Sequence, residues 1–407
     1  MQLNYADLLI IIIICIIVIS LYAYPIYKYT LYINNLNSTF EKETYIKTQL
    51  VIDKNNFLCI PGSINNKDTM NFIIDTKATS LMGEGFIQTN GGKYWGKLPF
   101  QMTNAYNQKQ KIKLYQFDKL VIGRQTIKNP LFTSIAKNNS IYELTGNGII
   151  GSEILSIATW KFDLEKKTID IFHCENHERL KKETNGFLKI ENGLVDEGIA
   201  LSIASLPEKE NFTLDLGFSG DIEINNNIRD MLIKVGCPYY KIKRINRNST
   251  SIDSIYVFKN IPIKIDTFEI KNCELVNISS VNHNYIGCIF MRNFNFVLMY
   301  GDYIEHEPQK HLFIKRIDTK KTRQSYHSKI SKFGLNIVKH NEKIFIRSIL
   351  ENGVAEKKNL ILGDEIIEIE NFDLLSDNLT DNFISYTENL DSICIKTPNK
   401  KVELRIE

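Results

Sequence analysis

The chain has 407 residues, of which 43% are hydrophobic and 24% are charged, so two or three globular domains are expected and a disordered or fibrous chain is excluded. Lys and Arg total 50 against 47 Asp and Glu, which gives a formal net charge of +3. Because this balance creates no basic field, no nucleic-acid partner is expected. The seven cysteines form no C-x-x-C pair, so neither a zinc ribbon nor a disulfide framework is predicted.

The first feature is an almost purely apolar run from Leu8 to Tyr24. With its flanks it reaches the ~20 residues that a membrane-spanning helix needs, and tyrosines gather at both ends, as in an interfacial belt. No basic residue precedes the run, which favours an anchor over a cleaved signal peptide. The unbroken run of isoleucines also disfavours a buried soluble helix. We therefore predict a transmembrane anchor over residues 1–30 of a single-pass cell-membrane protein. The bulk of the chain is expected to be periplasmic or extracytoplasmic, with the cytoplasmic face as the alternative.

From Tyr45 to about Glu305 the chain consists of short β-rich runs separated by turn residues, without long helical periodicity. This pattern predicts a mainly β region. Within it, a strand that ends in Asp occurs twice, in residues 72–80 (FIIDTKATS) and 212–220 (FTLDLGFSG). Each copy is followed by an apolar segment with a Gly, Gly151 or Gly287, and then by an apolar strand, residues 160–164 or 294–298.

The two copies predict a duplicated, two-lobed architecture with lobes at residues 45–175 and 186–310. The charged stretch 175–183 (ENHERLKKE) is interpreted as the linker between them. A lone Asp at the end of a strand is usually a turn former. Two equivalent ones, Asp75 and Asp215, can meet across a pseudo-twofold axis, where two close carboxylates share one proton. One then acts as a base on a water while the other polarises a carbonyl group.

Two other patterns are set aside. Residues 146–151 match G-x-G-x-x-G, but no buried strand precedes them and no βαβ alternation surrounds them, so no dinucleotide is expected. His173, Cys174 and His177 lie in the charged linker without a second ligand cluster, which indicates a solvated face. We therefore predict no cofactor and no metal site.

The C-terminal residues 328–407 change in character. Residues 344–349 read as a strand, 352–360 as a turn and short helix, and 393–396 and 402–406 as two further strands with alternation. Between them, residues 362–369 (LGDEIIEI) cluster apolar side chains around a turn. This pattern predicts a small, separate α+β domain.

The duplicated region resembles the retropepsin-like aspartic proteases in their single-chain form, whose lobes each carry an apolar-apolar-Asp-Thr-Gly motif and a later apolar-apolar-Gly segment. The resemblance implies an acid-protease-like β-barrel fold, and a cleft that holds an extended peptide by strand addition. It implies a catalytic pair formed by Asp75 and Asp215, which activates a water to hydrolyse peptide bonds. The residues implied in support of this pair are Thr76, Gly217, Ser219, Gly151 and Gly287. A flap is expected from the hairpin around Lys97 to Leu114.

Two departures from the motif leave an alternative open. Lys77 replaces the Gly, which risks strain and favours ionisation of the nearby carboxyl groups. Leu216 replaces the second Thr, whose hydroxyl bonds across the lobe interface in the family. The main prediction is an aspartic endopeptidase, and the alternative is an inactive, peptide-binding relative. A Lys77 side chain that points to solvent would leave catalysis open.

The C-terminal domain resembles a PDZ domain, chiefly through residues 362–369 and the preceding Gly353-Val354-Ala355. The resemblance implies capture of a peptide end or strand, with a carboxylate held by the loop of Phe333, Gly334, Leu335 and Asn336. The alternative is a domain that only packs against the lobes. Together, anchor, lobes and PDZ domain are similar to membrane-anchored aspartic proteases of bacteria, so we expect a monomer with a peptide or protein substrate.

Overall fold

The computed structural model describes residues 23–33, 35–36, 43–103, 109–135, 148–173, 175–245, 251–304, 307–317, 330–340, 342–376 and 379–406. The chain divides into two compact units. The first comprises Met1–Val195, Asp215–Gly217 and Phe294–Ile317, and the second comprises Asp196–Leu214, Phe218–Asn293 and Asp318–Glu407. The short segment Asp215–Gly217 thus packs with the first unit, although its neighbours in sequence belong to the second.

The first unit contains a strongly curved sheet of ten strands in the order β6-β7-β10-β5-β11-β4-β3-β8-β9, with β2 paired to β3. Its elements are β2 (Val51–Ile52), β3 (Leu58–Ile64), β4 (Met70–Ile74), β5 (Leu81–Gly83), α2 (Glu84–Thr89), β6 (Lys93–Thr103), β7 (Lys109–Gln116), β8 (Lys119–Ile122), β9 (Gln125–Lys128), β10 (Leu131–Ile135), β11 (Ile149–Ile150) and α4 (Ser152–Leu155). Most pairs are antiparallel, but β11 runs parallel to β4 and thereby closes the loop that follows β4.

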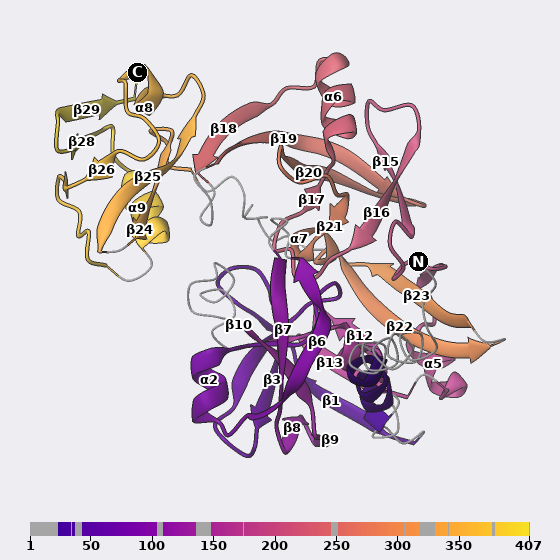
Figure 1. Cartoon of the computed structure of the whole chain (residues 1–407). Coiled ribbons are helices and arrows are strands. Elements are labelled where there is room, and N and C mark those ends of the chain that lie inside the picture. The colour runs from indigo at the N-terminus through magenta and orange to yellow at the C-terminus, as the bar shows by residue number, and fades with distance from the viewer. Residues whose placement is uncertain are drawn as a thin grey trace, which may run out of the picture. The chain divides into compact units, whose positions relative to one another are not determined.

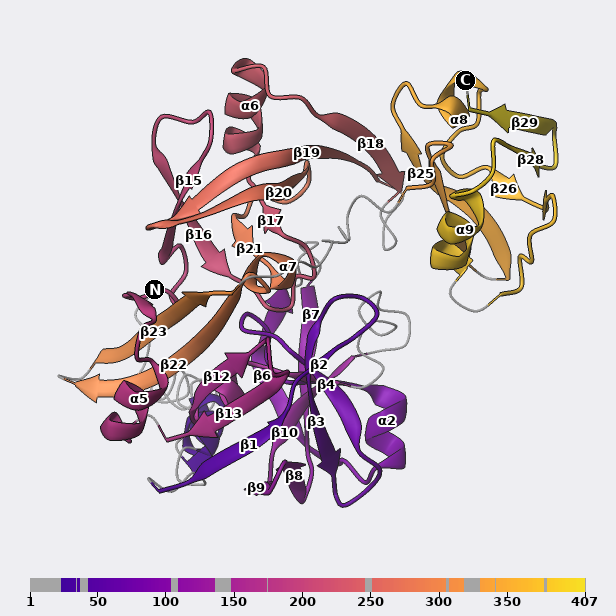
Figure 2. The ribbon, with the colours of Figure 1, turned by 180° about the vertical axis from the view of Figure 1, so that it is seen from behind.

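A second sheet of the first unit joins strands from both copies of the repeat, in the order β1-β13-β12-β22-β23-β14. Its strands are β1 (Tyr45–Gln49), β12 (Thr159–Asp163), β13 (Thr168–Phe172), β14 (Leu188–Ile190), β22 (Phe294–Ile304) and β23 (Glu307–Arg316). The orange strands β22 and β23 lie beside β12 and β13 in both views (Figures 1 and 2). The charged stretch before β14 forms helix α5 (His177–Glu183), whose first turn is capped by the Asn176 side chain.

The pairing of β12 with β22 reveals the symmetry of the repeat. Phe162 and Phe296 occupy equivalent places in the two copies, and they are register partners across these strands. Their rings stack with centroids 4.5 Å apart, and both side chains are fully buried. Equivalent residues that pair with each other mark a local twofold axis, which supports a duplicated origin of the two halves.

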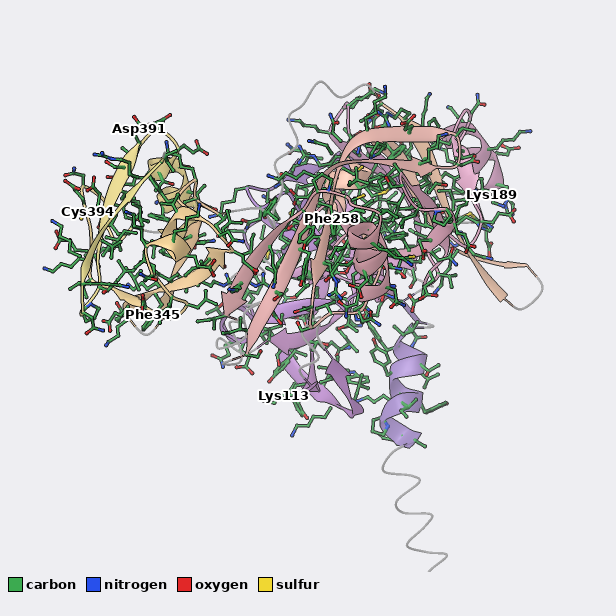
Figure 3. The ribbon with its side chains drawn as sticks, turned by 90° about the horizontal axis from the view of Figure 1, so that it is seen from above. Lys113, Lys189, Phe258, Phe345, Asp391 and Cys394 are labelled. Atoms are coloured by element: carbon green, nitrogen blue, oxygen red, sulfur yellow. The ribbon has the colours of Figure 1, made fainter. Side chains whose placement is uncertain are left out.

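The second unit repeats the curved sheet and extends it. Its elements before the C-terminal region are β15 (Ile199–Ile203), β16 (Lys209–Leu214), β17 (Ile222–Glu223), α6 (Asn226–Lys234), β18 (Tyr240–Ile245), β19 (Ile252–Ile265), β20 (Phe268–Ile278), β21 (Tyr285–Ile286) and α7 (Cys288–Met291). The strand order is β15-β16-β21-β17-β20-β19-β18-β25-β24. Phe258 of β19, labelled in Figure 3, is fully buried in this sheet. The prediction of a mainly β chain with barrel-like sheets is confirmed, and the arrangement is consistent with an acid-protease-like fold.

The C-terminal module, residues 330–406, has its own apolar core, which includes Phe333, Leu335, Phe383 and Leu404. Its elements are β24 (Leu335–His340), β25 (Lys343–Leu350), α8 (Val354–Lys357), β26 (Glu365–Ile366), β27 (Glu368–Ile369), α9 (Leu379–Thr387), β28 (Ser392–Lys396) and β29 (Lys401–Arg405). Strand β18 pairs directly with β25, as Figure 1 shows. The module is therefore joined to the preceding sheet by main-chain hydrogen bonds.

The predicted single-pass membrane location is wrong for the part of the chain that the structure describes, where no helix is both long and apolar enough to cross a bilayer. Residues 1–22, which hold most of the predicted anchor, lie outside the described residues. Its last residues begin a helix over 23–33 and 35–36. Tyr29 and Tyr32 of this helix pack against the first-unit residues Leu114 and Leu131, so Tyr29 is not the interfacial residue that the sequence predicted.

Candidate functional site

The first Asp loop, residues 75–80, begins where β4 ends. The N–H of Asp75 donates to the carbonyl of Ile150 at 3.0 Å, which continues the parallel β4–β11 pairing. Asp75 Oδ1 accepts hydrogen bonds from the N–H groups of Lys77 at 2.8 Å and Ala78 at 2.9 Å. Gly151 packs directly beneath, where a Cβ atom would clash with the backbone of residues 78–80. The tight loop therefore requires a glycine at this position.

The second Asp loop, residues 215–220, is built in the same way. Strand β21 runs parallel to β16, with Thr213 paired to Tyr285, and Gly217 N–H donates to Asp215 Oδ1 at 2.9 Å. A Cβ atom at Gly287 would clash with Gly220 and with Phe218, so Gly287 repeats the role of Gly151. Ser219 is buried in the second unit.

The structure brings residues 215–217 of the second loop against the first loop. Leu216 N–H donates to Thr76 Oγ1 at 3.1 Å. Gly217 lies so close to the Asp75 carboxyl group that a Cβ atom there would clash with it. Thr76 and Gly217, predicted from sequence as supporting residues, thus lie at the junction of the two Asp loops, and Gly217 N–H holds the Asp215 carboxylate.

Both departures from the family motif are accommodated. Lys77 is exposed to solvent, and its backbone does not adopt a positive φ, so no strain arises from the missing glycine. Its N–H still bonds to Asp75. Leu216 is fully buried; its side chain supplies no hydroxyl, but its main-chain N–H makes the contact to Thr76. The main chain therefore preserves contacts that the two side chains do not provide.

The electrostatics of the site favour a protonated carboxyl group. Burial raises the pKa of Asp75, while its hydrogen bonds from Lys77 and Ala78 N–H and the Lys77 charge oppose this rise. Tyr300 of β22 is also buried. Desolvation raises the pKa of Tyr300, and the negative charge of Asp75 raises it further. Tyr300 thus lies within electrostatic reach of Asp75.

Sequence reasoning missed two residues near this site. Tyr300 lies just beyond the predicted strand 294–298, and no motif marks it. Glu153 follows Gly151 by two residues, and a charged residue at such a place is expected on the surface. In the structure Glu153 is half-buried, and its carboxylate accepts hydrogen bonds from Ser80 N–H at 2.9 Å and Tyr29 Oη at 3.0 Å. Tyr300 and Glu153 could not be assigned to the site from sequence, because the residues that they approach, Asp75 and Tyr29, are far away along the chain.

The predicted flap corresponds to the hairpin of β6 and β7. Lys97 pairs with Lys113 in this hairpin, and Lys113 is placed in Figure 3. Residues 104–108, between the two strands, lie outside the described part of the chain. Strand β6 stands at one end of the ten-stranded order, next to β7 alone. Its outer main-chain groups therefore belong to a sheet edge, to which an extended chain can be added.

Within the described ranges, no three His, Cys, Asp or Glu side chains gather to hold a metal ion. Of the three residues with metal-binding side chains in the charged linker, Cys174 lies outside these ranges. His173 Nδ1 accepts a hydrogen bond from the Glu175 N–H at 3.2 Å. The G-x-G-x-x-G segment contains β11 and ends at Gly151, directly before the short α4; its residues 146–147 lie outside the described part of the chain.

The predicted carboxylate-binding loop of the C-terminal module is largely self-bonded. Phe333 and Leu335 are fully buried, and Gly334 has φ +79°, a conformation that favours glycine. Gly334 N–H donates to Ser331 O at 2.8 Å, and Leu335 N–H donates to Ser331 Oγ at 3.4 Å. Asn336 pairs with Ser348 in the ladder of β24 and β25, directly after the first pair of that ladder, Leu335 with Ile349. A bound carboxylate would therefore have to displace Ser331.

Comparisons with known proteins give only distant likenesses. No family model matches the chain, and no curated protein matches it. It is similar in structure to a retropepsin-like aspartic protease from Rickettsia conorii, with 18% identity and a TM-score of 0.23, over 31% of this chain and 90% of that one. It is also similar to Basic 7S globulin from soybean, with 10% identity and a TM-score of 0.36, over 70% of this chain and 96% of that one. At these scores the likenesses carry no argument, so the candidate site is judged by its own geometry.

Proposed function

We propose that the protein is an aspartic endopeptidase in which Asp75 and Asp215 activate a water. The observation that carries this proposal is the junction of the two Asp loops. Leu216 N–H bonds to Thr76 Oγ1, and Gly217 lies against the Asp75 carboxyl group while its N–H holds Asp215 Oδ1. Two carboxylate-bearing loops with matching backbones, joined in this way, are the arrangement that shared-proton chemistry needs.

The chemistry follows from how Asp75 is held. Its Oδ1 is fixed by two main-chain N–H groups, and Oδ2 is the oxygen nearest to Gly217. Because burial raises the pKa of Asp75, the pair retains one proton where two exposed carboxyl groups would both ionise. The ionised partner takes a proton from the attacking water, and the protonated one donates to the carbonyl oxygen of the peptide bond. No covalent intermediate with the protein is required.

An extended peptide has a natural place to bind in the first unit. Strand β6 is an edge strand, so its free main-chain groups can pair with a substrate strand. In the C-terminal module, β24 is likewise the last strand of its sheet, and we propose that it captures a peptide as a PDZ domain does. Thr380 of α9 donates from Oγ1 to Ile337 O of β24 at 2.8 Å. Peptide capture at this edge therefore competes with an internal hydrogen bond.

The second candidate function is peptide binding without cleavage, and Leu216 is the observation that favours it. A hydroxyl at this position would add a second bond across the junction, and the buried Leu216 side chain cannot make it. If the catalytic groups are held less firmly as a result, the protein would bind peptides and not hydrolyse them.

The test is cleavage of a mixed peptide library by the full chain across pH 3 to 8, followed by mass spectrometry. Asp75→Asn and Asp215→Asn are the test variants. Asp391→Asn is the matched control, because Asp391 is an exposed residue of the C-terminal module (Figure 3). Cleavage by the wild type and the control, but by neither test variant, supports the endopeptidase. Peptide binding without cleavage at any pH supports the second candidate instead.

A further inference from the structure

The N-terminal helix, described over residues 23–33 and 35–36, is attached to the first unit through two tyrosines. Tyr29 Oη donates to Glu153 Oε1 at 3.0 Å, and Tyr32 Oη accepts from Leu131 N–H at 2.9 Å. Both rings also contact the apolar cluster that includes Leu114 and Leu131. Burial raises the pKa of both tyrosines, so their hydroxyl groups remain protonated, and Tyr29 remains a hydrogen-bond donor to Glu153.

Packing beside these bonds is incomplete. A cavity of about 380 Å³ is lined by Lys28 and Leu31 of the helix and by Trp95 and Gln116 of the hairpin strands. Lys28 Nζ lies 4.1 Å from the centroid of the Trp95 ring, which is a cation–π contact. Tyr24, Ile26 and Tyr27 of the same helix are exposed, so only part of the helix packs against the unit. Local opening of a segment that is only partly packed exposes less apolar surface, so it requires less free energy than unfolding of the whole unit.

The Glu153 carboxylate divides its two oxygens between the helix and the first Asp loop. Oε1 accepts from Tyr29, whereas Oε2 accepts from Ser80 N at 2.9 Å and from Ser80 Oγ at 3.4 Å. Ser80 Oγ in turn accepts from Gly151 N–H at 3.0 Å. Burial raises the pKa of Glu153, and the hydrogen bonds from Tyr29 and Ser80 oppose that rise. The carboxylate is thus tied to both segments at once.

Ser80 and Gly151 frame the loop that carries Asp75. Gly151 packs beneath residues 78–80, and Ser152 N–H donates to Ala78 O at 2.9 Å. Ala78 N–H is one of the two donors that hold Asp75 Oδ1. A shift of Ser80 would therefore move the groups that orient the Asp75 carboxylate.

The second Asp loop forms without any such carboxylate. Gly220 occupies the place of Ser80, and the buried Ile289 occupies the place of Glu153. The equivalent backbone bond is nevertheless made, from Cys288 N–H to Phe218 O at 2.8 Å. Since the loop does not need a Glu or a Ser to fold, the half-buried Glu153 has a role that the fold alone does not explain.

We propose that Glu153 is a positioning residue through which docking of the N-terminal helix sets the geometry of the first Asp loop. This inference rests on the proposed function of that loop. With Tyr29 docked, its hydroxyl group holds the Glu153 carboxylate in place, and that carboxylate fixes Ser80. When the helix leaves, water reaches Glu153, the Ser80 N–H loses a firmly held acceptor, and Asp75 loses part of its orientation. The docked helix therefore supports activity.

The test uses the full chain and the variants Tyr29→Phe and Glu153→Gln. Tyr45→Phe is the matched control, since Tyr45 Oη makes the same kind of bond to Asp170 Oδ1, at 2.7 Å, elsewhere in the first unit. Amide hydrogen exchange is measured on fragments that cover residues 76–82 and 148–152. A hydrogen bond to a charged group is lost, so Tyr29→Phe is expected to accelerate exchange in both fragments about tenfold. Tyr45→Phe is expected to leave both unchanged.

Peptide cleavage by the same proteins supplies the second readout. Misorientation of Asp75 lowers kcat about tenfold and leaves KM within about twofold, because substrate contacts are not altered. Unchanged exchange in Tyr29→Phe and Glu153→Gln would overturn the inference, as would faster exchange with kcat retained. If the wild type cleaves no peptide but the variants exchange faster, the proposed function fails and the link between helix and loop stands.

Discussion

Replacement of Thr76 by Val tests the junction of the two Asp loops most directly. Val has the same shape but removes Oγ1, which accepts from Leu216 N–H at 3.1 Å. Leu216 is fully buried, so water cannot readily replace this acceptor. A lost hydrogen bond that leaves a buried donor unpaired costs about 1–3 kcal/mol. We expect the free energy of unfolding of the first unit to fall by this amount. We also expect kcat to fall at least about tenfold, because the bond helps to hold the two Asp loops in place and small misplacements of catalytic groups slow the reaction.

The measurement is urea-induced unfolding followed by tryptophan fluorescence. Both tryptophans, Trp95 and Trp160, belong to the first unit, so the signal reports on the unit that holds the junction. Thr76→Ser is the control, since it keeps the hydroxyl and should retain most of the stability and activity. If Val and Ser variants were equal in both assays, the Thr76–Leu216 bond would carry no weight and the reasoning about the junction would be refuted.

Three further predictions follow. Gly217→Ala places a Cβ against the Asp75 carboxyl group, so cleavage should fall at least about 100-fold, whereas retained activity would contradict the junction. Burial raises the pKa of Glu223 from 4.5 to about 7. The folded state therefore loses about 3 kcal/mol of stability as pH rises through this window, and Glu223→Gln should remove that loss in urea unfolding followed by circular dichroism. Thr380→Val frees Ile337 O and should tighten binding of a fluorescent extended peptide about threefold to tenfold, while unchanged affinity would argue against capture at β24.

Much of the first Asp loop could be predicted because its determinants are local. A strand that ends at Asp75 and a glycine that must pack beneath residues 78–80 each leave a mark in the sequence. The repeat of the same pattern at Asp215 and Gly287 predicted the second loop in the same way. Consistent local signals of this kind specify structure independently of distant contacts.

The rest depends on contacts between distant segments. Tyr29 and Glu153 are 124 residues apart. The apolar run before Tyr29 predicted a membrane environment for this tyrosine, but its ring contacts other residues of the first unit. Tyr300 approaches Asp75 only because β22 joins the six-stranded sheet. The pairing of β18 with β25 could not be predicted from sequence either, because main-chain hydrogen bonds between strands do not depend on particular side chains.

The two Asp loops share a backbone but differ in what surrounds it. The first is supported by polar groups, Glu153 and Ser80, while the second is supported by apolar packing, with the Phe218 ring against Gly220 and Gly287. In both loops, main-chain N–H groups hold the carboxylate. Substitutions at positions 77 and 216 therefore leave these donors in place, which explains how the proposed catalytic pair accommodates them. The side chains around each loop then determine how rigidly the loop is held and how readily its carboxyl group binds a proton. In the first loop these side chains include Glu153, which connects the loop to the N-terminal helix through Tyr29.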